Sequence, residues 1–130
     1  MSEKVYETIA NSYAEKIRTL IEREKLPASY ENIVEQHWRP LADKIQQWRE
    51  AAQKPIVIGV NGAQGSGKST MCIFVTEALL PEYGVKAATL SLDDFYLTRS
   101  ERAALAEDIH PLLATRGPPG THDVAMLKAV

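Results

Sequence analysis

The chain has 130 residues, 45% of them hydrophobic and 25% charged, a composition typical of globular proteins that argues against disordered and fibrous classes. Its 15 basic and 17 acidic side chains give a net charge of -2, so no diffuse positive field favours nucleic acid. A single cysteine excludes an intrachain disulfide, and no apolar stretch approaches the roughly 20 residues that span a bilayer. These features predict a cytoplasmic protein that binds neither membranes nor nucleic acid.

Residues 1–54 are predicted to form a helical N-terminal segment. Apolar side chains recur three and four positions apart through residues 3–25, from Val5 and Ile9 onward, and again through residues 33–48. Pro27 separates the two patterns, and Pro40 is expected to break the second one near residue 39. The two stripes indicate packing against the following domain, and the alternative is a face that binds a partner protein.

The pattern changes after Pro55. Residues 56–60 form a β-branched run typical of a strand that is covered on both faces, and residues 85–92 are predicted to form a second strand. Between them the sequence predicts a helix that buries Met71, Phe74, Val75, Ala78 and Leu79. A strand, a helix and a strand make a βαβ unit, so the predicted fold class is α/β, a parallel sheet flanked by helices.

The segment GAQGSGKS, residues 62–69, fits the pattern G-x-x-x-x-G-K-[ST] between a predicted strand and a predicted helix. Glycines let backbone amides surround a polyphosphate, Lys68 reaches its outer phosphates, and Ser69 offers a hydroxyl to Mg²⁺. A turn needed only for tight packing would not require this lysine and serine. The predicted nucleotide-binding residues are Gly62, Ala63, Gln64, Gly65, Ser66, Gly67, Lys68, Ser69 and Thr70.

Two acids, Asp93 and Asp94, follow the second predicted strand. Parallel strands end at one edge of a sheet, so these carboxylates are expected near the terminal phosphate, with one of the two facing the site. Such a carboxylate could accept the proton of an attacking hydroxyl or help to hold Mg²⁺. The alternative is that the acids only end the strand and cap a turn.

The segment LSLDDFYLT resembles the phosphoribulokinase and uridine kinase group of P-loop kinases, in which an acid before a Phe-Tyr pair follows the second strand. The segment HPLLATRGPPGTHD is similar to one in the D-glycerate 3-kinase branch and its related bacterial kinase-like proteins. The resemblance implies that Asp93 is the catalytic acid and that Tyr96 lines the acceptor pocket. It also implies that Asp123, with His122 beside it, contacts acceptor hydroxyls.

The segment HPLLATRGPPGTHD contains further candidate residues. Arg116 is a candidate clamp for a carboxylate, because a planar guanidinium fork matches that group. For His122 and Asp123 the alternative is bracing of the loop or capping of the last helix, residues 124–130. His110, which precedes a proline, is expected to fix a turn.

The resemblance also implies parts that this sequence lacks. Kinases of the group have several parallel strands, a further acidic Mg²⁺ ligand and an arginine-bearing lid, and none of these has a counterpart here. Residues 55–130 are therefore predicted to be the truncated N-terminal part of a P-loop kinase domain, preceded by the extension 1–54. Catalysis by these residues alone is not expected.

The predicted function of the whole protein is phosphoryl transfer from ATP, with Mg²⁺, to a hydroxyl of D-glycerate or a similar hydroxy acid. Lys68 and Asp93 are the predicted catalytic residues, and Ser69 and Asp93 the predicted metal ligands. The alternatives are a nucleoside or other small-molecule kinase, and a non-catalytic nucleotide-binding sensor or scaffold. No protein partner is predicted.

Overall fold

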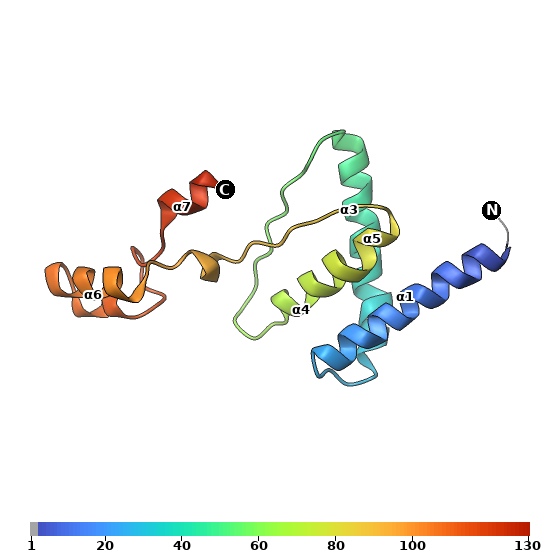
Figure 1. The fold of residues 1–130 in the computed structure, drawn as a ribbon, viewed down its shortest axis with the longest axis horizontal. Coiled ribbons are helices and arrows are strands. Elements are labelled where there is room, and N and C mark those ends of the chain that lie inside the picture. The colour runs from blue at the N-terminus through green and yellow to red at the C-terminus, as the bar shows by residue number, and fades with distance from the viewer. Residues whose placement is uncertain (1–2) are drawn as a thin grey trace. The chain divides into compact units, whose positions relative to one another are not determined.

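The computed structural model describes the backbone of residues 3–130 and the side chains of residues 12–130. The chain divides into two compact units, Met1–Thr89 and Leu90–Val130 (Figure 1). The N-terminal helices share the first unit with the glycine-rich loop and the helix that follows it. The predicted domains 1–54 and 55–130 stay a prediction.

The two predicted N-terminal helical patterns are confirmed. Helix α1 covers Glu3–Arg23; the side chains of Val5 and Ile9 on its predicted stripe lie outside the described residues. The second pattern is one continuous helix made of α2 (Tyr30–Ile33), the π-helical segment η1 (Val34–Trp38) and α3 (Arg39–Ala52). Within the described range, no helix is both long and apolar enough to cross a membrane.

The second helix does not break near residue 39 as predicted. Arg39 has helical backbone angles, with φ at -63° and ψ at -51°. Pro40 has no amide hydrogen to donate to the preceding turn, and the wider π-helical segment η1 comes directly before it. The proline therefore changes the hydrogen-bonding pattern of the helix without ending it.

A third helix begins at the glycine-rich loop and carries the predicted apolar face. It consists of α4 (Lys68–Ile73), the π-helical segment η2 (Phe74–Leu79) and α5 (Leu80–Glu82). The Phe74 side chain is fully buried, and its ring centroid lies 5.4 Å from that of Tyr30. The core of this unit joins the third helix to the N-terminal helices through Ile17, Leu20, Ile21, Val34, Ala42, Ile45, Phe74, Val75, Ala78 and Leu79. The helices of the N-terminal segment thus hold the helix that follows the loop.

The predicted parallel sheet is wrong, because the described residues form no strand and no sheet. Residues 55–62 and 85–90 are irregular, and Leu92–Phe95 forms a 3₁₀ turn, η3, instead of the end of a strand. A strand needs a neighbour that accepts and donates its backbone hydrogen bonds, and residues 55–62 find none among residues 3–130. Val57 is accordingly 100% exposed. A run of β-branched residues favours an extended backbone, but it cannot supply the neighbouring strand that a sheet requires.

In the second unit, η3 is followed by α6 (Arg99–Asp108), η4 (Pro111–Ala114) and α7 (Val124–Ala129). The predicted capping box is confirmed, because Thr98 accepts from the amide of Glu101 while the Glu101 carboxylate accepts from the amide of Thr98. His110 fixes a turn, as expected, since its ring nitrogen Nδ1 accepts from the Leu112 amide at 3.2 Å. Local hydrogen bonds thus define where α6 and η4 begin.

Tyr83, next to the end of α5, gives the first unit a pH-dependent contact with α3. Burial, followed by the hydrogen bond that Tyr83 donates to Asp43, raises the pKa of the Tyr83 phenol from 10.0 to about 12. Because the folded-state pKa lies above the unfolded value, this stabilisation is fully present below pH 10 and is lost as the pH rises through 12. We expect the urea midpoint of the wild type to fall more steeply across this window than that of Tyr83→Phe, which cannot ionise. Parallel curves for the two proteins would contradict the assignment.

Candidate functional site

The glycine-rich loop turns sharply before α4. Gly65 and Gly67 have φ values of 76° and 85°, in the left-handed region that side chains rarely adopt. The Ser66 amide donates to the Ala63 carbonyl at 3.2 Å, and Gly67 is the N-cap residue of α4. The loop is therefore curled, and two of its glycines are required by its backbone conformation.

Lys68 lies inside this curl. Its ammonium Nζ donates to the carbonyl oxygens of Gly62 at 2.8 Å and Ala63 at 2.7 Å. A Cβ atom added to Gly62 would lie 3.0 Å from the Ser66 hydroxyl and 3.4 Å from Cγ and Cδ of Lys68. A side chain at position 62 would therefore crowd the Ser66 hydroxyl and touch the lysine stem, so a glycine fits this close approach without displacing either.

The start of α4 fits a phosphate group. Among residues 12–130 no acceptor binds the backbone amides of Gly67, Lys68, Ser69 and Thr70. Unpaired amides at a helix start, with the positive end of the helix dipole, bind anions, and the Lys68 ammonium adds a full positive charge beside them. The loop thus has the donors that a polyphosphate requires.

For a divalent cation the loop offers a single ligand. The Ser69 side chain is exposed at the first turn of α4. Within the described part of the chain, no three His, Cys, Asp or Glu side chains gather to hold a metal ion. Mg²⁺ in phosphate-transfer sites is held by one or two protein oxygens together with substrate phosphates and water, so a lone serine at this position fits that ion.

The two acids of the second unit differ in what they bind. The Asp94 carboxylate accepts from the Ser91 amide at 3.3 Å, while the Ser91 hydroxyl accepts from the Asp93 amide at 3.2 Å, so both cap η3. The exposed Asp93 carboxylate has no hydrogen bond within residues 12–130. The Asp94 carboxylate thus caps the turn, as the alternative interpretation expected, whereas the Asp93 carboxylate is available to bind other groups.

The structure does not support the reasoning that brought Asp93 beside the loop. The prediction relied on two strands that end at a common sheet edge, and the described residues form no sheet. Lys68 belongs to Met1–Thr89 and Asp93 to Leu90–Val130. The catalytic role of Asp93 and its role as a metal ligand therefore stay predictions.

Three of the four predicted acceptor-binding residues lie together in the second unit. The Tyr96 and His122 rings are stacked, with centroids 4.1 Å apart and planes 27° from parallel, and the Arg116 carbon Cζ lies 5.3 Å from the Tyr96 centroid. We call Tyr96, Arg116 and His122 the aromatic cluster. Asp123 has a capping role instead, since its carboxylate accepts from the Met126 amide at 2.8 Å at the start of α7. The cluster presents an exposed guanidinium next to two stacked rings, a combination suited to a small anion.

Backbone and buried side-chain contacts hold this cluster in place. The Leu97 amide donates to Thr121 and the Asp123 amide to Phe95, which joins the two segments that carry the rings. Arg102, 8% exposed, donates from Nη1 to the Leu97 carbonyl at 2.5 Å and from Nε to the Ala114 carbonyl at 3.3 Å. The sequence pattern alone does not distinguish Arg102 from the exposed arginines of the chain. The one signal available was its place on the same face of α6 as Leu105.

Comparisons with known proteins place relatives of this chain among kinases. It is 40% identical over 96 residues to the uncharacterized kinase mug58 of Schizosaccharomyces pombe, covering 69% of this chain and 34% of that protein. It is 41% identical over 91 residues to the probable ATP-dependent kinase TDA10 of Saccharomyces cerevisiae, covering 66% of this chain and 31% of the relative. It is 40% identical over 74 residues to the chloroplastic D-glycerate 3-kinase of Arabidopsis thaliana, covering 55% and 16%.

The chain thus spans about a third of the length of the first two relatives. No family model matches the sequence, and no solved structure matches it. These similarities indicate that the chain is related to proteins that are named as kinases.

Proposed function

We propose that the protein is an ATP-dependent kinase that transfers the terminal phosphoryl group of ATP to a hydroxyl of a small molecule. The observation that carries this proposal is the curled loop of residues 62–69, with Lys68 inside it and free amides at the start of α4. The names of the three relatives, all kinases and one of them ATP-dependent, support the same class.

The residues take separate roles in this proposal. The amides of residues 67–70 and the Lys68 ammonium bind the outer phosphates and stabilise the negative charge that develops on them. Ser69 contributes a hydroxyl to Mg²⁺, which neutralises phosphate charge when it is bound. Asp93 accepts the proton of the attacking hydroxyl.

The proposed acceptor is D-glycerate or a similar hydroxy acid. The aromatic cluster supports a carboxylate-bearing acceptor, because Arg116 offers a planar pair of donors beside the Tyr96 and His122 rings. The relative named D-glycerate 3-kinase supports the same choice. A nucleoside acceptor has no comparable observation in its favour.

The direct test is turnover by the full-length protein. ATP and Mg²⁺ are supplied with a panel of hydroxy acids and nucleosides, and both ADP and the phosphorylated acceptor are quantified. We expect ADP in equal amount to a phosphorylated hydroxy acid. ATP binding without acceptor-dependent turnover would replace the kinase proposal with a nucleotide sensor, and turnover with nucleosides alone would replace the acceptor.

Arg116→Gln tests the assignment of the acceptor site. A charged hydrogen bond to a carboxylate contributes about 1.5 to 3 kcal/mol, so the KM for the hydroxy acid should rise at least about tenfold. The KM for ATP should stay unchanged. Arg99→Gln, which removes another exposed arginine of the same unit, is the matched control and should leave both constants near their wild-type values. An unchanged acceptor KM in Arg116→Gln would remove Arg116 from the site.

A further inference from the structure

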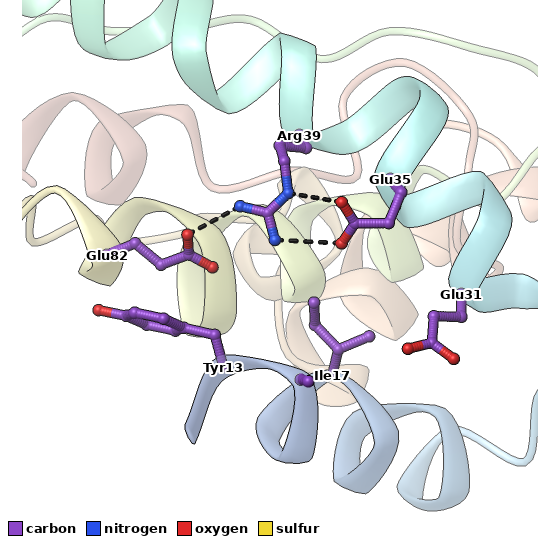
Figure 2. A pocket seen from close by; sticks show the side chains of 7 residues that line it. Tyr13, Ile17, Glu31, Glu35, Arg39 and Glu82 are labelled. Atoms are coloured by element: carbon purple, nitrogen blue, oxygen red, sulfur yellow. Dashed lines mark hydrogen bonds and ion pairs between the residues drawn. The ribbon is translucent and has the colours of Figure 1, made fainter. Parts of the chain in front are cut away.

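A polar pocket of about 310 Å³ lies within the first unit, and none of its lining residues belongs to the glycine-rich loop (Figure 2). Its walls come from α1, α2, η1, α3 and α5, and it is lined by Tyr13, Ala14, Ile17, Glu31, Glu35, Arg39 and Glu82. Arg39 binds two carboxylates there. Its Nε and Nη2 donate to Glu35 at 2.7 and 3.1 Å, and its Nη1 donates to Glu82 at 2.7 Å.

Glu82 depends on Arg39 for its pairing. Its side chain is only 15% exposed, and its second carboxylate oxygen, Oε1, is buried with no hydrogen-bond partner among the described residues. If the guanidinium were removed, a buried carboxylate would keep its charge without a partner, which is far more unfavourable than losing an exposed pair. Glu82 would then have to move towards water.

A displaced Glu82 also displaces the helix that carries the loop. Glu82 is the last residue of α5, and the helix runs without interruption from there back to Lys68 at the loop. Apolar packing selects the buried face of this helix but is non-directional, so it constrains rotation and sliding less than a hydrogen-bonded ion pair does. Arg39 thus fixes the end of the helix opposite the loop.

The π-helical segment η2 lies between this fixed end and the loop. π-helical turns are less regular than α-helical ones and can change their hydrogen-bonding register. A shift by one residue would rotate the loop end of the helix by about 100° relative to α5. The second π-helical segment, η1, packs in the same core and contains Glu35, the other partner of Arg39. One guanidinium therefore bonds Glu35 in η1 and Glu82 in α5, the turn that follows η2.

We propose that Arg39 is a positioning residue for the phosphate-binding loop. By pairing with Glu35 and Glu82 it sets the register of the helix 68–82, and so the direction of the amides at residues 67–70. This inference rests on the proposed function, because it treats those amides as the phosphate ligands.

The test compares Arg39→Met with the double variant Arg39→Met/Glu82→Leu in the full-length protein. ATP affinity with Mg²⁺ and hydrogen exchange of the hydrogen-bonded amides of residues 71–73, the first of which donates to the Gly67 carbonyl, are measured below the unfolding temperature of each variant. Arg39→Met should lose at least about tenfold in ATP affinity and exchange faster at these amides, because small displacements weaken oriented contacts. The double variant should regain stability, since the unpaired carboxylate is gone, but not ATP affinity or slow exchange, because the ion pair that sets the register is still absent.

A matched control uses the exposed ion pair that joins the same helix to α1. Arg23 binds Glu77 with side chains 48% and 44% exposed, so Arg23→Met should change ATP affinity by less than about twofold. If Arg39→Met does not fold, Arg39→Lys replaces it. This variant should lose more ATP affinity than the control and exchange faster than the wild type, because an ammonium lacks the planar fork that binds both carboxylates.

The outcomes separate the two proposals. Wild-type affinity and exchange in Arg39→Met or Arg39→Lys would overturn the positioning role, as would a double variant restored to wild-type values in both measurements. If the wild type binds no ATP, the proposed function fails, and the exchange data alone decide whether Arg39 sets the register of the helix.

Discussion

Lys68→Ala is expected to abolish phosphoryl transfer by the full-length protein and to weaken ATP binding by about tenfold to a hundredfold. The ammonium lies within the loop and donates to the carbonyls of Gly62 and Ala63. It is therefore already close to the start of α4, where the free amides can bind an anion. Removing it takes away a charge-assisted donor that interacts most strongly when negative charge grows on the transferred group. Calorimetric titration with ATP and Mg²⁺, together with an ADP-release assay, measures the two effects.

The matched control is Lys86→Ala, which removes an exposed lysine that follows the same helix. It should leave ATP affinity and turnover unchanged, because its charge does not lie in the loop. Equal effects of the two substitutions would mean that only the overall charge matters. An unchanged affinity in Lys68→Ala would remove the loop from nucleotide binding altogether.

Patterns within a few residues of one another were sufficient to predict the helices of this chain. The spacing of apolar side chains predicted α1, the helical pattern of residues 33–48 apart from the break expected near residue 39, and the buried face that includes Phe74 and Val75. Thr98 with Glu101 predicted a capping box. The predictions of strands were wrong because a strand depends on contacts that are not local. A strand is defined by a hydrogen-bonded neighbour, which the sequence of residues 56–60 cannot specify by itself.

The candidate site divides in the same way. The conformation of the loop is local, and the positive φ values of Gly65 and Gly67 agree with what the glycine spacing predicted. Arg39 and Arg102 could not be predicted as important, because their partners Glu82 and Ala114 lie 43 and 12 positions away. Only folding reveals which carboxylate or carbonyl a long side chain reaches.

Asp93→Asn is expected to abolish transfer to the acceptor while ATP affinity stays within a few-fold of the wild type. The carboxylate is the proposed acceptor of the hydroxyl proton, and an amide of the same size cannot take that proton at neutral pH. The Asp93 amide nitrogen would still donate to Ser91, so the cap of η3 is retained. Single-turnover measurements with saturating ATP separate this loss in the chemical step from a loss in binding.

Asp94→Asn is the matched comparison, because the neighbouring carboxylate is engaged with the Ser91 amide. Asn keeps an acceptor oxygen but loses the negative charge at the start of η3, so stability should fall by about 0.3 to 1 kcal/mol and the rate of transfer should stay nearly unchanged. The two substitutions make the same chemical change one residue apart, so a difference in rate reflects position alone. If Asp94→Asn lost transfer and Asp93→Asn did not, the roles of the two acids would be exchanged. A parallel loss of ATP affinity and transfer in Asp93→Asn would instead assign that carboxylate to metal binding.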